Sequence, residues 1–133
     1  MNKTCLNPKG LFNSTDFGFS QIVVSQPGKI VFISGQVAWD ENRTILGKGD
    51  LKIQTRKAFE NLKLAIKTAG GNLSHITMLR LYIVNYQQAD GGIISEVLRE
   101  YFGTKTPPAS TWINVAGLAN EDFLIEVEAQ AVI

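Results

Sequence analysis

Two carboxylates near the end of the chain are the residues best suited to proton transfer. Glu126 and Glu128 lie two positions apart in residues 123–133, where apolar and polar residues alternate. Both are therefore expected on one face of a strand. A carboxylate in a semi-enclosed cleft can act as a general base and take a proton from water. We take Glu128 as the candidate catalytic residue; the competing interpretation is that it forms an ion pair.

Arg80 is the cation expected to lie nearest to these carboxylates. It is in the middle of residues 76–84, another alternating segment, on the face opposite to Leu79 and Leu81. Arg80 could bind a ligand, or it could pair with Glu126 or Glu128 and balance charge at an interface. Charges on inward faces are normally paired, which favours the ion pair, although both roles are compatible.

Small polar residues at two strand ends could donate hydrogen bonds to a bound oxyanion. They are Ser34 with Gly35, and Ser110. The alternative is ordinary turn structure, with Gly35 allowing a bend, and for Gly35 we favour that alternative. No base is adjacent to either serine, so a serine-nucleophile triad is not predicted.

Metal and thiol chemistry have little support. His75 is the only histidine and lacks the cysteine or carboxylate spacing of a metal site. Cys5 is the only cysteine, which excludes an intrachain disulfide. We therefore predict no metal and no cofactor. The lone cysteine, and residues 1–8 without the pattern of a signal peptide, predict a cytoplasmic protein.

Size and charge limit the class of protein. A chain of 133 residues fits one domain, predicted to span residues 1–133. The formal net charge is only +1 and the basic residues are dispersed, which disfavours nucleic-acid binding. The apolar runs are far shorter than the roughly 20 residues that cross a bilayer.

Two segments have helical periodicity. In residues 50–69 apolar residues recur every three or four positions, with Asp50 as a suitable N-cap and Gly70 after the last turn. Residues 92–102 form the second predicted helix, which ends at Gly103. Both are expected to lie on an apolar surface.

The strands are predicted at residues 20–26, 29–34, 76–84, 111–116 and 123–133. Pro27 and Gly28 are turn residues, so the first two strands are expected to form a β-hairpin. The order of elements predicts an α+β fold in which both helices cover one face of a mostly antiparallel sheet.

The other face of this sheet needs a cover. Large residues are expected there beside charged ones: Met78, Tyr82, Leu124 and, if the strand register holds, Trp112. A monomer that left this apolar area in water would be unusual, so the pattern indicates self-association.

Five short segments, in this order along the chain, resemble motifs of the YjgF-like reactive-intermediate deaminase family. They are residues 33–36 (ISGQ), 69–71 (AGG), 81–83 (LYI), 108–111 (PAST) and 125–129 (IEVEA). No single segment is specific, but the ordered set spans nearly the whole chain.

This resemblance implies a chorismate-mutase-like fold of the bacillus type, assembled as a homotrimer. The sheets would face inward, the helices outward, and three clefts would form between subunits. It also implies hydrolysis of imines or enamines such as 2-aminoacrylate to 2-keto acids and ammonia, without a metal or cofactor. Some members of the family are labelled endoribonucleases.

The chain departs from the family pattern at the implied site. Ser110 stands where deaminating members have an arginine that pairs with the substrate carboxylate, and Phe19 stands where they have a tyrosine. Trp112 replaces a small residue, and Ser95 aligns with an asparagine. A hydroxyl cannot replace a two-pronged guanidinium, and the loss of such a pair weakens binding by about 2–5 kcal/mol. Ser34, Gly35 and Glu128 remain.

Three functions stay open at this point. The first is a trimer that binds a small carboxylate, imine or enamine in its clefts and hydrolyses it with Glu128, outside the standard 2-aminoacrylate reaction. Ser110, Thr111 and Arg80 would position the ligand. The second is a non-catalytic binding or regulatory trimer. The third, ribonuclease activity or RNA binding, is disfavoured by the charge balance.

Overall fold

A computed structural model describes residues 3–133 of the chain. A four-stranded sheet has the order β3-β6-β4-β5, and β1 and β2 form a separate two-stranded sheet. The strands are β1 (Lys3–Leu6), β2 (Ile22–Ser25), β3 (Ile30–Gln36), β4 (Ile76–Val84), β5 (Ala109–Val115) and β6 (Ile125–Val132). The helices are α1 (Leu51–Thr68) and α2 (Gln88–Phe102), with short 3-10 turns η1 (Ser14–Phe17) and η2 (Leu73–His75).

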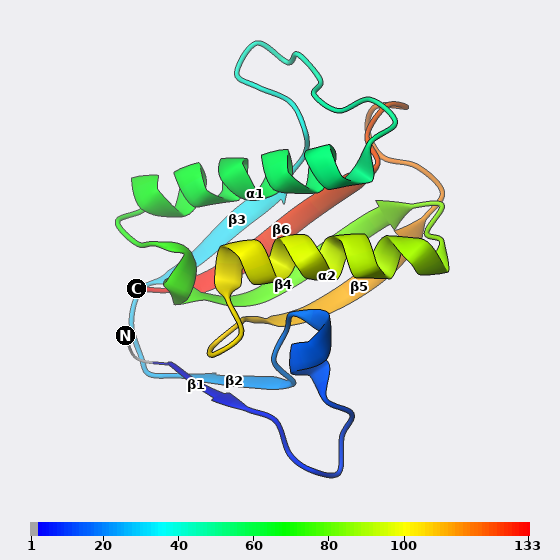
Figure 1. The fold of residues 1–133 in the computed structure, drawn as a ribbon. Helices are drawn as coiled ribbons and strands as arrows, with labels where there is room; N and C mark the ends of the chain where they lie inside the picture. Colours follow the sequence, from blue (N-terminus) through cyan, green and yellow to red (C-terminus); the bar gives the residue numbers. More distant parts are fainter. Residues whose placement is uncertain (1–2) are drawn as a thin grey trace.

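Figure 1 shows both long helices on the same face of the four-stranded sheet. In this sheet β6 is antiparallel to β3 and β4, while β4 and β5 are parallel. The α+β architecture with two helices on one face is therefore confirmed, with a single parallel pair at the β5 edge.

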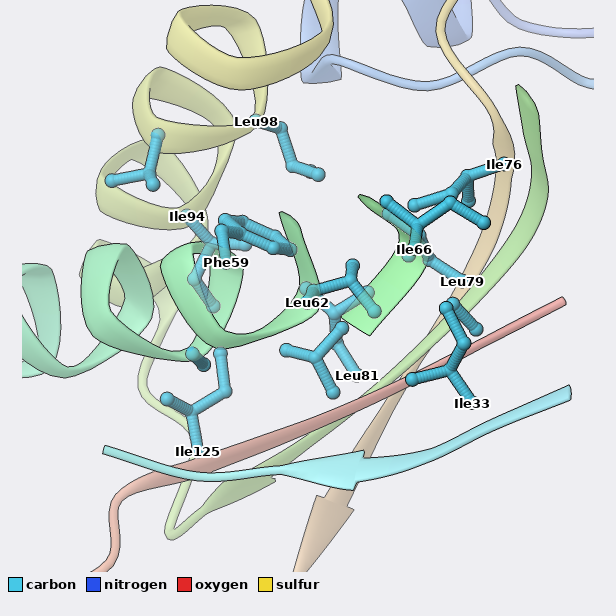
Figure 2. Close-up of a cluster of buried hydrophobic side chains, with 14 of the residues drawn as sticks. Ile33, Phe59, Leu62, Ile66, Ile76, Leu79, Leu81, Ile94, Leu98 and Ile125 are labelled. Carbon is cyan, nitrogen blue, oxygen red and sulfur yellow. The ribbon is translucent and has the colours of Figure 1, made fainter. Parts of the chain in front are cut away.

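The core lies between the helices and this sheet. Figure 2 shows buried side chains from every layer, with Phe59 and Leu62 of α1 packed over Leu81 of β4 and Ile125 of β6. Alternation along each strand sends these residues inward and their sequence neighbours to the opposite face. That opposite face has no helix on it in Figure 1; we call it the open face.

Helix α1 begins and ends where its sequence predicts. The Asp50 carboxylate accepts a hydrogen bond from the backbone N–H of Ile53 at 3.0 Å, which satisfies a free donor of the first turn. Gly70 follows the helix with φ of 95°, a left-handed conformation that glycine adopts without strain.

Helix α2 begins at Gln88, four residues before the predicted start. Glycine is a weak helix former, yet Gly91 and Gly92 both lie inside the observed helix. The Asp90 carboxylate, however, accepts a hydrogen bond from the backbone N–H of Gln87 at 2.8 Å and stabilises the first turn. This cap outweighs the low propensity of the two glycines.

The predicted hairpin between residues 20–26 and 29–34 is wrong. Strand β2 pairs with β1, and β3 pairs only with β6. The backbone N–H of Ser20 donates to Pro108 O at 3.0 Å and its hydroxyl to Pro107 O at 2.6 Å. These long-range bonds hold the start of β2 at the β5 side of the sheet, away from β3 in Figure 1.

Because β2 does not pair with β3, β3 lies at one edge of the four-stranded sheet, and its outer edge is unpaired within residues 3–133. Two large apolar side chains of β3 are mostly in solvent, Ile30 at 65% and Phe32 at 72% exposure. Exposed strand edges with apolar side chains are typical sites of association. We therefore expect the outer edge of β3, like the open face, to be covered by another chain.

The start of β6, which carries both candidate carboxylates, is held by one buried amide. Gln54 of α1 donates to Asp122 O at 2.8 Å and to Gly47 O at 3.2 Å, and its oxygen accepts from the Leu124 N–H at 2.8 Å. A buried amide with these three bonds is well satisfied. Gln54 therefore fixes the point at which the chain enters β6.

Tyr101 joins the two helices and supports a prediction about pH. Its hydroxyl donates to Glu60 Oε1 at 2.9 Å and lies 3.3 Å from Arg56 O. Burial, followed by the bond to Glu60, raises the pKa of Tyr101 to about 12. The unfolded value is about 10, so above pH ~10 the unfolded chain loses this proton before the folded protein does.

The contribution of Tyr101 to stability is therefore complete below pH ~10 and is lost as the pH rises towards 12. We expect the free energy of unfolding in urea to fall more steeply between about pH 10 and 12 for the wild type than for Tyr101→Phe. Equal slopes for the two proteins would contradict this prediction.

Candidate functional site

The predicted site residues occupy two surfaces of the protomer. In the β4–β5 register Ser110 neighbours Leu79, and Thr111 neighbours Arg80. Leu79 is buried under the helices, whereas Arg80 is on the open face, so Ser110 and Thr111 point to opposite sides of the sheet. Within residues 3–133 of one protomer, Ser110 and Glu128 therefore lie on opposite sides of the sheet and do not line a common pocket.

Ser110 lies in a cavity of about 330 Å³ beside the β5 edge. We call it the aromatic pocket; its lining residues are Phe12, Phe17, Phe19, Tyr86, Ser110 and Trp112. The structure thus brings together three of the residues identified from the sequence, Phe19, Ser110 and Trp112. Three lining residues are not predicted from the sequence: Phe12, Phe17 and Tyr86. The phenylalanines at positions 12, 17 and 19 nevertheless form a dense group in the sequence.

Trp112 is not on the open face, contrary to the prediction. Parallel pairing places it beside Leu81, a buried residue, and it packs against the core. Its indole N–H donates a hydrogen bond to Ser110 Oγ at 3.1 Å. Trp112 is therefore both a packing residue and part of the pocket wall.

Two glycines near the pocket allow close packing of the segments that carry its lining residues. A Cβ on Gly18 would lie 2.9 Å from the Leu98 Cβ, and Gly18 has a φ of 91°. A Cβ on Gly91, inside α2, would lie 2.7 Å from the Tyr86 hydroxyl oxygen. Glycine inside a helix lowers the stability of the fold by about 0.5–1 kcal/mol relative to alanine. Gly91 therefore weakens α2 but leaves room for the Tyr86 hydroxyl.

The open face holds the candidate base. The Tyr82 hydroxyl donates a hydrogen bond to Glu128 Oε1, and this bond raises the pKa of Tyr82 above its usual value. The tyrosine is therefore a neutral donor near pH 7 that orients the carboxylate. Within residues 3–133 no hydrogen bond occupies Glu128 Oε2, so this oxygen is available to a water molecule or a ligand.

The favoured ion pair of Arg80 is absent from the protomer. Arg80 is the register neighbour of Glu128 on β4 and β6, yet it forms no salt bridge with any residue of the described chain. Glu128 receives the Tyr82 hydroxyl instead. Arg80 is thus a cation on the open face that has no acidic partner within the described protomer.

Ser34 and Gly35 lie at an irregularity of β3 between Ile33 and Gln36. A Cβ on Gly35 would lie 2.6 Å from the Glu126 Cδ, so glycine leaves room for the carboxylate of Glu126. The carbonyl of Ser34 accepts a hydrogen bond from Gln36 Nε2 at 2.9 Å. These contacts agree with the structural interpretation of Gly35; a ligand role for either residue stays a prediction.

Ser95, the remaining candidate, is buried in α2 at 4% exposure. Its hydroxyl has no hydrogen-bond partner in the part of the chain that the structure describes. It does not line the aromatic pocket, so its predicted contact with a ligand remains a prediction.

Metal binding and thiol chemistry have no geometric support within residues 3–133. The acidic, histidine and cysteine side chains there form no group of three or more that could hold a metal ion. His75 Nδ1 accepts a hydrogen bond from the Asn72 N–H at 3.0 Å, and Cys5 Sγ donates to Pro107 O at 3.4 Å. No helix in this range is long and apolar enough to cross a bilayer.

Comparison with known proteins assigns these features to a family. The sequence pattern of the endoribonuclease L-PSP family matches residues 14–133. The chain belongs to this family. This confirms the resemblance to the YjgF-like reactive-intermediate deaminases predicted from the sequence.

Relatives within the L-PSP family cover most of the chain. A RutC family protein of Pyrococcus horikoshii is 35% identical over 113 residues, or 85% of each chain. The 3-aminoacrylate deaminase RutC of Acinetobacter baylyi is 31% identical over 110 residues, covering 83% of this chain and 84% of that one. The crystal structure of YyfB from Yersinia pestis, a Rid family protein of unknown function, aligns over 100% of both chains with 35% identity and a TM-score of 0.96.

Proposed function

We propose that this protein is a homotrimer that binds a small imine or enamine in clefts between its subunits and hydrolyses it to a carbonyl compound and ammonia. The observation that carries the proposal is the Tyr82–Glu128 pair, an oriented carboxylate with one free oxygen on an uncovered sheet face. The deaminase name of the Acinetobacter relative supports the reaction class. The predicted cytoplasmic location is part of this proposal.

Assembly is needed because the candidate groups are separated in one protomer. Ser110 is on the helix side of β5, and Glu128 is on the open face. The open face and the β3 edge also expose apolar side chains such as Phe32. Closed association of identical chains covers such a surface and can place the aromatic pocket of one copy against the open face of another.

The reaction needs one water molecule and one base. Glu128 takes a proton from water while the water oxygen forms a bond to the imine carbon, and it then gives this proton to the nitrogen, so that a neutral carbinolamine forms. Glu128 next takes the hydroxyl proton of the carbinolamine and passes it to the nitrogen as the carbon–oxygen double bond forms and the carbon–nitrogen bond breaks. The products are a carbonyl compound and ammonia, so atoms and charge balance.

The substrate of this reaction differs from 2-aminoacrylate in our proposal. The aromatic pocket has Ser110 where the resemblance implies a carboxylate-binding arginine. Arg80, which has no acidic partner in the described protomer, is the one cation that we place near Glu128. Thr111, its register neighbour on β5, would position a ligand beside it.

A coupled assay tests the proposal. Imines are generated in the cuvette by an amino-acid oxidase, by a flavin amine oxidase acting on benzylamine, or, for 2-aminoacrylate, by a serine dehydratase. We expect the protein to accelerate ammonia release from at least one oxidase-derived imine, and 2-aminoacrylate to be hydrolysed at the spontaneous rate. Acceleration of none of them would contradict hydrolysis and favour the non-catalytic binding trimer. RNA cleavage that is lost in Glu128→Gln would instead support the ribonuclease alternative.

A further inference from the structure

We infer that the aromatic pocket binds an uncharged, ring-bearing group and rejects a carboxylate. This rests on the proposed function in one respect: the ring would belong to the imine that is hydrolysed, which would then carry an aromatic or similarly large apolar substituent. The binding preference itself follows from the pocket alone.

The lining supplies apolar surface and almost nothing else. Five of its six residues are aromatic, and none carries a charge at neutral pH. A cavity of about 330 Å³ is at the lower end of the size range of small-molecule sites. It suits one ring with a short substituent better than a three-carbon keto acid, which would leave most of the apolar wall in contact with water.

The rings are arranged to receive another ring. Phe12 meets Phe17 and Phe19 edge to face, with centroid distances of 5.9 and 6.1 Å and interplanar angles of 77° and 74°. Phe19 and Trp112 are tilted by 56° at 6.2 Å. Aromatic pairs prefer such edge-to-face or offset geometry. Phe12 and Phe17 are 60% and 49% exposed, so ring surface is accessible at the mouth of the pocket.

Ser110 limits the polar chemistry of the pocket. Its oxygen already accepts the Trp112 indole N–H, and its own proton has no acceptor within residues 3–133. The hydroxyl can therefore donate one neutral hydrogen bond to a ligand. A carboxylate would lose its hydration against the aromatic wall without a cation in return, which is strongly unfavourable.

Ligand binding to the aromatic pocket can be followed by the fluorescence of Trp112 alone. The chain has two tryptophans, and Trp39 packs against Phe123 at a centroid distance of 5.0 Å, outside the aromatic pocket. In a Trp39→Phe background the fluorescence therefore reports on Trp112. The probes are benzamide and benzoate, which have the same shape and differ in charge.

We expect benzamide to change the Trp112 fluorescence saturably, and benzoate to bind at least about ten times more weakly, a difference of about 1.4 kcal/mol. Phe19→Ala is expected to weaken benzamide binding several-fold. Ser110→Arg adds the missing guanidinium and is expected to reverse the preference in favour of benzoate.

Two results would overturn the inference. One is tighter binding of benzoate than of benzamide; if Arg80→Ala then removed the benzoate binding, Arg80 would be the cation of the pocket. The other is that neither probe binds while circular dichroism shows a folded protein.

The same titration separates this inference from the proposed function. Benzamide binding without ammonia release from any imine would leave the pocket assignment intact and contradict hydrolysis. Ammonia release together with a preference for benzoate would support hydrolysis and contradict the pocket assignment.

Discussion

Replacing Glu128 with glutamine is expected to slow imine hydrolysis by about 10²–10⁴-fold, the usual contribution of a general base. Glutamine keeps the shape of the side chain and can still accept the hydrogen bond from Tyr82, but it cannot take a proton from water. The loss should therefore appear in kcat, with a small effect on KM and on the unfolding midpoint in urea. The measurement is ammonia release from the imine that the wild type hydrolyses fastest.

Glu126→Gln is the matched control for this variant. Glu126 is on the same strand and the same face as Glu128 and has the same charge. It is the register neighbour of Tyr82, but its carboxylate lies beside Gly35 and the Tyr82 hydroxyl donates to Glu128 instead. We expect its activity to stay within about threefold of the wild type, since it removes the charge but no base. If both variants were equally impaired, the effect would belong to the charge of the open face and not to a general base.

Replacing Phe32 with lysine is expected to break the trimer. Phe32 is 72% exposed on the unpaired edge strand β3 and is the register neighbour of Gln130, so it lies on the open face, which we propose is covered by a neighbouring subunit. An unpaired ammonium in a buried apolar contact costs several kcal/mol, so we expect the dissociation constant to rise by at least about 100-fold. Light scattering at about 10 µM should then give the mass of one chain for the variant and of three chains for the wild type.

Leu64→Lys is the control for exposure alone. Leu64 is a large apolar residue on α1 and is 66% exposed, close to the value for Phe32. It lies on the helix layer, which our proposal leaves in solvent, so this variant should remain trimeric. A wild type that is monomeric, or a Phe32→Lys trimer as stable as the wild type, would contradict the proposed assembly and with it the shared cleft.

The sequence predicted the parts of the fold that depend on local pattern. The three-and-four spacing around Phe59 and Leu62 located α1 to within a residue, because helical periodicity needs only neighbouring residues. Alternation likewise assigned Leu81 to the core and Tyr82 to the other face of β4. The missed start of α2 was also local, since the cap supplied by Asp90 outweighs two glycines.

Strand partners and surfaces were decided only in the tertiary structure. The hairpin expected at Pro27 fails because Ser20 bonds to Pro107 and Pro108, 87 residues away or more, and these contacts leave no local trace. Trp112 lies on the helix side of the sheet and not on the predicted open face for the same reason, because the parallel register with β4 sets the direction of its side chain.

The chain itself therefore determined the chemistry on offer: a carboxylate at 128, a serine at 110 where the family resemblance implies arginine, and a group of phenylalanines near the N-terminus. The tertiary structure decided which of these groups meet, because distant segments share a surface only after the strands have chosen their neighbours. It placed Phe19, Ser110 and Trp112 around one apolar cavity and left Glu128 with Tyr82 on the open face.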